Sequence, residues 1–276
     1  MDRMATKSSG AGQGIERVAA ILRAVATHNS TGARLVDVET ATGLSKSTVH
    51  RLLSSLAAQG LVEQGDEGSA FFLSFDLLQL GAAAANRYGV VDVARPHLER
   101  LAERVGDTVI LSIAAGTDCV VIDRAEGDFP VQINTPWLGE RRPLGIGAGS
   151  LAILAAMPDE AIDETLRANR EGYARFPNVD QATVRGLIPA ARDNGYVFND
   201  GVFIPGMCTL GCAAVASNGK PLAALSITAI RERMEEPRRA QLIRWLQEEA
   251  ASLAEHLQPL YAAKLRRSSK VAGVRL

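Results

Sequence analysis

The residues of this chain best placed to do chemistry form one polar row between Gly43 and Val62. The row consists of Ser45, Lys46, Ser47, Thr48, His50, Arg51 and Ser54, and no Asp or Glu interrupts it. Hydroxyl, imidazole, ammonium and guanidinium groups donate hydrogen bonds to phosphates and to the acceptor edges of DNA bases. The row therefore predicts a surface that contacts double-stranded DNA. A helix pair that contacts only protein is the alternative interpretation of the same residues.

A helix must hold these side chains on one face. The apolar positions recur at the spacing that lays one stripe against a core, and they are Val49, Leu52, Leu53 and Leu56. The polar row then falls on the opposite face. Gly43 suits a tight turn before this helix, and Ser45 is a candidate N-cap for its backbone N–H groups. With the short helix before the turn, residues 32–62 have the pattern of a helix-turn-helix.

The flanking residues predict a winged version of this motif. Upstream, apolar residues repeat with a helical period at Ile15, Val18, Leu22 and Val25. Residues 14–58 are therefore expected to form three helices. Downstream, residues 60–63 and 70–73 flank a turn-rich loop, which is typical of a β-hairpin.

Charge is distributed so that the second helix of the pair must supply most contacts with DNA. The 276 residues are 47% hydrophobic and carry a formal net charge of −1, so nonspecific attraction to nucleic acid is weak. The predicted wing is acidic through Glu63, Asp66 and Glu67, and no Lys or Arg occurs between Arg51 and Arg87.

No cofactor or metal site is expected. The chain has three cysteines, Cys119, Cys208 and Cys212, which is an odd number, and no two of them form a Cys-x-x-Cys motif. The four histidines lack the spacing of metal ligands. No apolar run is long enough to predict a membrane span, and no signal peptide is recognisable. We therefore expect a cytoplasmic protein with reduced thiols.

Beyond residue 74 the sequence predicts a linker helix and an α+β domain. Residues 75–87 are rich in helix formers, and their alanine-rich surface suits pairing with a second copy. Further helices are predicted at 91–105, 151–156, 159–169, 181–193 and 237–263, and strands at 108–114, 119–123, 131–134, 195–199, 209–217 and 222–228. Helices that flank an antiparallel sheet define the α+β class. The expected domains are 1–74 for DNA binding, 75–90 as linker helix, 91–263 as second domain, and 264–276 as a basic, disordered tail.

A glycine-rich loop at 139–150 precedes the helix predicted at 151–156. Backbone N–H groups at a helix start can hold a carboxylate or a phosphate without any charged side chain. The loop lacks the Lys and the Ser or Thr of a P-loop, so nucleotide hydrolysis is not expected. A sharp turn that binds no ligand is the alternative.

Several segments match landmarks of a known family in the same order. They are Thr42–Leu53, Ala94–Ala102, Arg142-Pro143-Leu144, Gly195-Tyr196, Gly206 and Ala224-Leu225-Ser226-Ile227. The chain thereby resembles the isocitrate lyase regulator (IclR) family of bacterial transcription factors. The resemblance implies a winged DNA-binding domain, a linker helix, and a GAF-like domain that binds a small effector, usually an organic acid. It also implies dimers or dimers of dimers.

The resemblance further implies which residues bind the effector. They are Ile146, Gly147, Ala148, Asn199, Thr209, Ser226 and Thr228, with Trp137, Leu144, Phe203 and Met207 as apolar walls. Where many members have His, Thr and Gly-Lys along the loop, this chain has Gly145, Gly147 and Ser150-Leu151, which removes side-chain donors and leaves backbone amides. It also has Asn199-Asp200 where an acidic pair is usual. A larger or aromatic acid is therefore among the expected ligands.

The combined prediction is a ligand-responsive transcriptional regulator, repressor or activator, that binds a pseudo-palindromic operator as a dimer. Two other classes remain open. A GAF-like cysteine redox enzyme would require the three cysteines to meet in the fold. A protein-interaction module would use the helix pair on protein.

Overall fold

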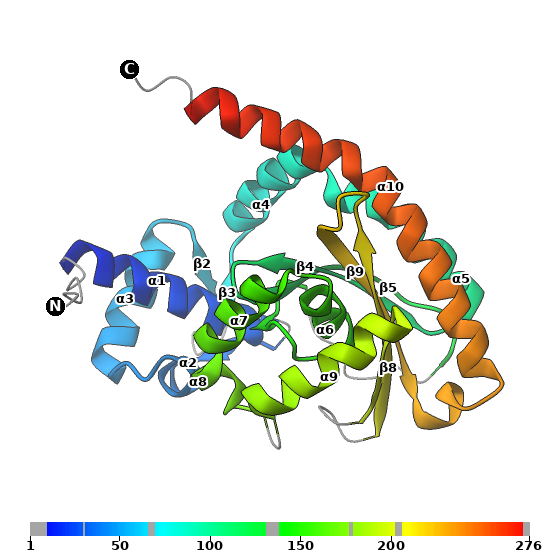
Figure 1. Cartoon of the computed structure of the whole chain (residues 1–276). Coiled ribbons are helices and arrows are strands. Elements are labelled where there is room, and N and C mark those ends of the chain that lie inside the picture. The colour runs from blue at the N-terminus through cyan, green and yellow to red at the C-terminus, as the bar shows by residue number, and fades with distance from the viewer. Residues whose placement is uncertain are drawn as a thin grey trace, which may run out of the picture. The chain divides into compact units, whose positions relative to one another are not determined.

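The computed structural model describes residues 10–29, 31–65, 70–130, 138–176, 179–201 and 206–272 (Figure 1). The chain divides into two compact units, Met1–Arg87 and Tyr88–Leu276. The strand predicted at 131–134, the apolar walls Trp137 and Phe203, and the wing residues 66–69 lie outside the described residues. Among the helices that are described, none has the length and apolarity needed to cross a membrane.

The first unit is a helical bundle with a small antiparallel sheet. Its elements are α1 (Gly10–Thr27), β1 (Ala33–Arg34), α2 (Leu35–Thr42), α3 (Lys46–Ala58), β2 (Val62–Gln64), β3 (Ala70–Leu73) and α4 (Phe75–Tyr88). The strands pair in the order β1-β3-β2. Ile21, Val38 and Leu53 are fully buried where the first three helices meet. The predicted winged helix-turn-helix is confirmed, with β1 added because a two-residue strand leaves no alternation to detect.

Ile15 departs from the apolar stripe predicted for α1. Its side chain is 72% exposed, whereas Ile21 and Val25 on the same helix are fully buried. From α1, the hydrophobic core of this unit contains Val18, Ile21, Leu22, Ala24 and Val25 but not Ile15. The helical period in the sequence therefore begins before the part of α1 that is packed against the core.

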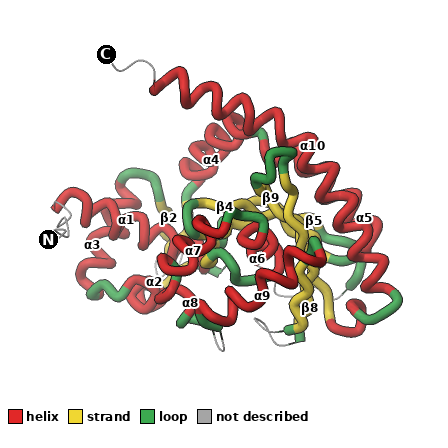
Figure 2. The backbone as a smooth tube through the Cα atoms, in the orientation of Figure 1, coloured by secondary structure: helices red, strands yellow, loops and turns green. Residues whose placement is uncertain are grey.

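The second unit is a six-stranded antiparallel sheet with helices on both faces (Figure 2). Its strands are β4 (Thr108–Ala115), β5 (Asp118–Ala125), β6 (Arg141–Pro143), β7 (Val197–Asp200), β8 (Met207–Val215) and β9 (Pro221–Ile230), in the order β6-β5-β4-β9-β8-β7. Its helices are α5 (Val90–Val105), α6 (Ala148–Ala155), α7 (Asp159–Ala168), α8 (Arg170–Tyr173), α9 (Gln181–Asn194), the 3-10 turn η1 (Arg231–Met234) and α10 (Arg238–Ala272). This arrangement confirms the predicted α+β class.

Two hydrophobic cores sandwich the sheet. Helices α5 and α10 bury one face, and α6 with α7 and α9 buries the other. The central strand β9 is buried continuously from Leu222 to Ala229 because both of its faces are covered. Strand β5, nearer the edge, alternates between buried and half-buried residues. The segment between β6 and β7, which contains α6, α7 and α9, therefore covers one face of the sheet.

Several ends differ from the prediction for local reasons. Helix α6 starts at Ala148 instead of 151, because Gly147, with φ of 92°, ends the preceding loop. Helix α10 continues to Ala272 instead of ending at 263, since no Gly or Pro interrupts the sequence between Pro259 and Gly273. The sequence does not predict β6, α8 or η1, which are three or four residues long.

A buried polar cluster fastens α5 to α10. His97 is buried, and its Nδ1 lies 2.5 Å from Oε1 of Glu249 while its Nε2 lies 3.2 Å from Nδ1 of His256. Burial lowers the pKa of His97 against the opposing effect of Glu249. No group of three or more His, Cys, Asp or Glu in the described ranges could hold a metal ion. The cluster therefore acts as a link between two helices.

Candidate functional site

The turn between α2 and α3 fixes where α3, which carries the predicted DNA-contacting side chains, begins. Gly43 has φ of 66°, in the left-handed region that strains other residues, and its N–H donates to the Glu39 carbonyl at 2.8 Å. Ser45 is the N-cap residue, but the predicted bond from its side chain to the helix backbone is wrong. Its hydroxyl instead lies 3.0 Å from the hydroxyl of Thr48. The two hydroxyl groups satisfy each other at the start of α3.

Helix α3 presents its polar row outward as the sequence predicts. Ser45, Lys46, Ser47, His50, Arg51 and Ser54 are exposed and Thr48 is half-buried, while Val49, Leu53 and Leu56 are buried. The Ser54 hydroxyl donates to the His50 carbonyl at 2.9 Å. Within the described residues, no hydrogen bond or ion pair is recorded for the side chains of Lys46, His50 or Arg51. These three are the long donors available to a partner.

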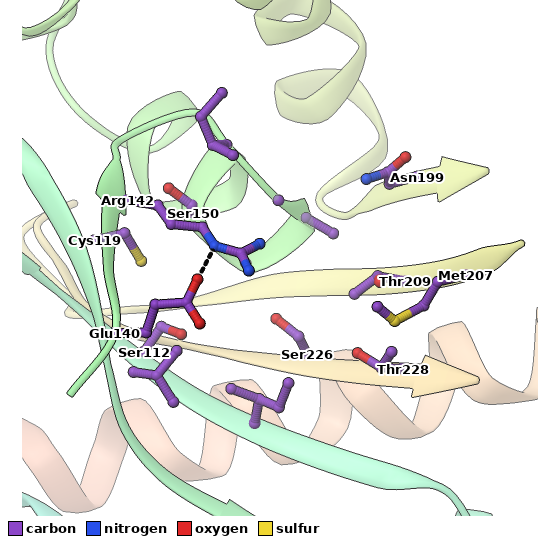
Figure 3. Close-up of a pocket in the computed structure, with 16 residues that line it drawn as sticks. Ser112, Cys119, Glu140, Arg142, Ser150, Asn199, Met207, Thr209, Ser226 and Thr228 are labelled. Carbon is purple, nitrogen blue, oxygen red and sulfur yellow. Dashed lines mark hydrogen bonds and ion pairs between the residues drawn. The ribbon is translucent and has the colours of Figure 1, made fainter. Parts of the chain in front are cut away.

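The second unit encloses a cavity where α6 begins (Figure 3). All seven residues predicted to bind an effector line it, namely Ile146, Gly147, Ala148, Asn199, Thr209, Ser226 and Thr228. Ile146 and Gly147 lie in the loop before α6 and Ala148 begins α6, while β7, β8 and β9 supply the four polar side chains. The cavity has a volume of about 80 Å³, where a single water needs about 10–15 Å³ by the same measure. A small organic molecule fits.

The backbone of β8 and the first turn of α6 approach each other closely behind the cavity. A Cβ atom built on Gly211 would lie 2.3 Å from the carbonyl carbon of Ala148 and 2.4 Å from the backbone nitrogen of Gly149. Only glycine permits this contact. It holds the first turn of α6 against the sheet, so the helix start faces the cavity.

Sequence reasoning missed a charged pair in the cavity wall. Arg142 of β6 donates from Nε to Oε1 of Glu140, and both residues line the cavity. Ser112 on β4, Cys119 on β5 and Ser150 on α6 are further polar lining residues that the sequence does not indicate. The cavity therefore contains a guanidinium group in addition to the predicted neutral side chains. Its only sequence signal is the double arginine before Pro143.

Two predicted neighbours of the cavity lie elsewhere. Asp200 follows Asn199 but points away, and its carboxylate accepts a 2.7 Å hydrogen bond from Arg231. The Cys208 thiol, which donates to this carboxylate at 3.1 Å, and the ion pair with Arg231 lower the pKa of Asp200. Leu144 is fully buried in the core beneath α6 and is not among the lining residues, whereas Met207 is.

The three cysteines do not meet. Cys208 and Cys212 belong to the core on the α10 side of the sheet, and Cys119 belongs to the core on the α6 side. All three are free, and burial raises the pKa of each thiol to about 11. This separation gives no support to a cysteine redox site.

We expect the native thiols to react slowly with dithiodipyridine. The thiolate is the nucleophile, and a pKa of about 11 leaves about one thiol in 10⁴ ionised at pH 7. In urea, Cys119, Cys208 and Cys212 should all react rapidly. Absorbance of the released thiopyridone measures both rates. A rapid reaction of one native thiol would contradict the geometry and reopen the redox interpretation.

A helix-turn-helix unit joined to a helix-covered sheet with a polar cavity defines a DNA-binding regulator with a ligand-binding domain. Family comparisons agree on both parts. The IclR helix-turn-helix domain matches residues 14–66, and the C-terminal domain described as "Bacterial transcriptional regulator IclR C-terminal" matches residues 82–255. The chain belongs to the IclR family of bacterial transcriptional regulators.

Individual relatives have the same organisation. The HTH-type transcriptional repressor AllR of Escherichia coli (strain K12) is 29% identical over 82% of this chain and 83% of its own length. An IclR transcriptional regulator from Alicyclobacillus acidocaldarius has a similar crystal structure, with a TM-score of 0.72 and 21% identity over 89% of this chain and 98% of its own. An IclR homologue from Microbacterium hydrocarbonoxydans, complexed with 4-hydroxybenzoate, has a TM-score of 0.68 and 23% identity over 89% and 99%. These structural similarities confirm the fold. The relatives are named as transcriptional regulators, which agrees with the prediction of a protein that is not an enzyme.

Proposed function

We propose that this regulator binds a pseudo-palindromic operator as a dimer and responds to a small organic acid in the cavity of its second unit. The observation that carries the proposal is the cavity itself, because a helix-turn-helix alone gives DNA binding but no response. Seven residues from distant parts of the chain converge on it, with buried hydrogen-bonding groups at Asn199, Ser226 and Thr228. Concave sites with a few convergent polar groups are typical of ligand pockets.

The DNA contacts are assigned to α3. The donors presented to the major groove belong to Lys46, Ser47, His50 and Arg51. Hydroxyl groups near the DNA phosphate backbone come from Ser45, Thr48 and Ser54. The weakly charged chain and the acidic wing leave this helix as the principal reader. The basic residues of the C-terminal segment 264–276 are not needed for this assignment.

Dimer formation is supported by the linker helix α4. Phe75, Leu78 and Leu80 are 65%, 63% and 61% exposed, which is unusual for large apolar side chains on one helix. The alanine-rich sequence that follows them gives little bulk to hinder a second helix. Two copies paired through α4 would carry two reading helices, and ligand binding would shift the population of DNA-competent dimers.

Selection of duplexes from a random DNA library by the full chain tests this function. We expect enrichment of an inverted repeat whose half-site centres lie about 10 base pairs, or a multiple, apart. A small acid that raises the melting temperature of the protein should also change its affinity for the selected duplex. If no duplex is enriched even at low salt, the DNA-binding proposal fails and the protein-interaction module is favoured.

A further inference from the structure

Arg142 is the cationic side chain in the cavity wall, and it is held in an unusual way. Its side chain is 22% exposed, and that of its partner Glu140 is 8% exposed. Among the described residues, the only recorded hydrogen bond of this guanidinium is from Nε to Glu140. Figure 3 shows the two terminal nitrogens of Arg142 directed into the cavity. The guanidinium therefore presents its double N–H edge to whatever occupies that space.

A guanidinium fork matches a carboxylate better than any other small group. Its terminal N–H groups form two parallel hydrogen bonds with the two carboxylate oxygens. The side chain of Arg142 is partly exposed and its terminal nitrogens face the cavity, so a ligand anion there can accept hydrogen bonds from both. The hydrogen bond from Nε to Glu140 orients the fork so that its terminal nitrogens point into the cavity.

The opposite end of the cavity has different chemistry. In Figure 3, Asn199, Thr209 and Thr228 lie at the far end from Arg142 and Glu140. These side chains are uncharged and both donate and accept hydrogen bonds. Apolar side chains, such as Ile110 and Val121, line the cavity together with these polar groups. A ligand that fits this pattern has a carboxylate at one end and a neutral polar group at the other.

We propose that Arg142 is the specificity-determining residue that receives the carboxylate, and that the ligand is a hydroxy- or oxo-substituted carboxylic acid whose second polar group meets Asn199, Thr209 and Thr228. This inference rests on the proposed ligand-responsive function. The start of α6 is the competing anion site, and a partly buried helix terminus changes affinity by up to about 30-fold. Hydrogen bonds to a charged partner change it about 10- to 100-fold, so we assign the larger share to Arg142.

The test compares acids with their uncharged amides on the full chain. The probes are 4-hydroxybenzoate, lactate and levulinate, each beside its primary amide, and binding is measured by calorimetry and by thermal shift. We expect at least one acid to bind the natural protein, with its amide at least about tenfold weaker. Amides that bind as tightly as the acids, or a panel in which no acid binds, would overturn the inference.

Arg142→Met removes the fork while keeping a side chain of similar length. It should weaken binding of the acid about 10- to 100-fold. Arg142→Lys keeps the charge without the fork, so its affinity should lie between those of the natural chain and Arg142→Met. Arg141→Met is the matched control, because Arg141 pairs with Asp118 at 3.0 Å and does not line the cavity. It should bind the acid within about twofold of the natural chain, since no contact with the ligand is lost. The melting temperature without probe checks that each variant is folded.

The two proposals fail in different ways. If Arg142→Met binds the acid as tightly as the natural chain does, the role of Arg142 is wrong while DNA binding still stands. If the natural chain enriches no duplex, or if acid binding leaves its DNA affinity unchanged, the ligand-responsive function is wrong, whatever Arg142 does. Loss of acid binding in Arg142→Met and its retention in Arg141→Met would support the inference.

Discussion

Replacing Arg51 by alanine is expected to weaken binding to a selected operator by about 1 to 3 kcal/mol for each half-site that the helix reads. Arg51 is exposed on the face of α3 opposite Val49 and Leu53, so truncation leaves the core intact. If two copies read two half-sites, the loss doubles to about 2 to 6 kcal/mol. Fluorescence anisotropy of a labelled selected duplex, measured over a series of salt concentrations, gives both the loss and its origin.

The salt series separates two roles for Arg51. A base contact lowers the affinity for the selected duplex and the preference over random DNA, with little change in the salt slope. A phosphate contact lowers the affinity for every duplex and reduces the slope by about one per site. Arg23→Ala is the control, because Arg23 is an exposed cation of the same unit but lies on α1. An Arg51→Ala variant that binds the selected duplex as tightly as the natural chain would contradict its assignment.

The large effect expected for Arg51 follows from the lack of positive charge in the segment of the first unit that follows it. No Lys or Arg occurs between Arg51 and Arg87, and Glu63 is exposed on β2 of the wing. Nonspecific attraction cannot compensate for a lost contact when the net charge of the chain is −1. If α3 contacts DNA as proposed, single substitutions on its exposed face should therefore have large effects.

Local sequence pattern predicted α3 and its exposed polar face, but not the charged part of the cavity. The stripe of Val49, Leu53 and Leu56 lies within a single helix, so its period alone indicates which side chains face outward. Arg142 faces the cavity only because β6 pairs with β5, with Cys119 opposite Arg142. That pairing joins residues more than twenty positions apart, and a three-residue strand leaves no periodic signal.

A β-bulge explains why the lining of the cavity could not be read from alternation. The β4–β5 ladder shifts register between Leu111 and Ser112, whose partners are Asp123 and Val121. Val121 lines the cavity, whereas Asp123, two residues later, pairs with Arg95 of α5 on the other side of the sheet. Strict alternation would place both on one face. One extra residue therefore divides a strand between two environments.

Gly211→Ala is expected to destabilise the second unit by about 3 kcal/mol or more and to abolish ligand binding. The added Cβ would lie 2.3 Å from the carbonyl carbon and 2.5 Å from the carbonyl oxygen of Ala148, which are backbone atoms that no rotamer change can move. Helix α6 would have to leave the sheet, and its first turn lines the cavity. Urea unfolding followed by tryptophan fluorescence reports this unit, because both tryptophans lie within residues 88–276.

Gly186→Ala makes the same chemical change where the structure offers open space. Gly186 is exposed within α9, and a Cβ there meets no atom within 4 Å. Because alanine favours a helix interior over glycine, this variant should gain about 0.5 to 1 kcal/mol of stability. The two substitutions should therefore shift the urea midpoint in opposite directions, which a general sensitivity to added methyl groups cannot produce. If Gly211→Ala unfolds at the natural midpoint, the close contact between β8 and α6 is wrong, and so is the cavity built upon it.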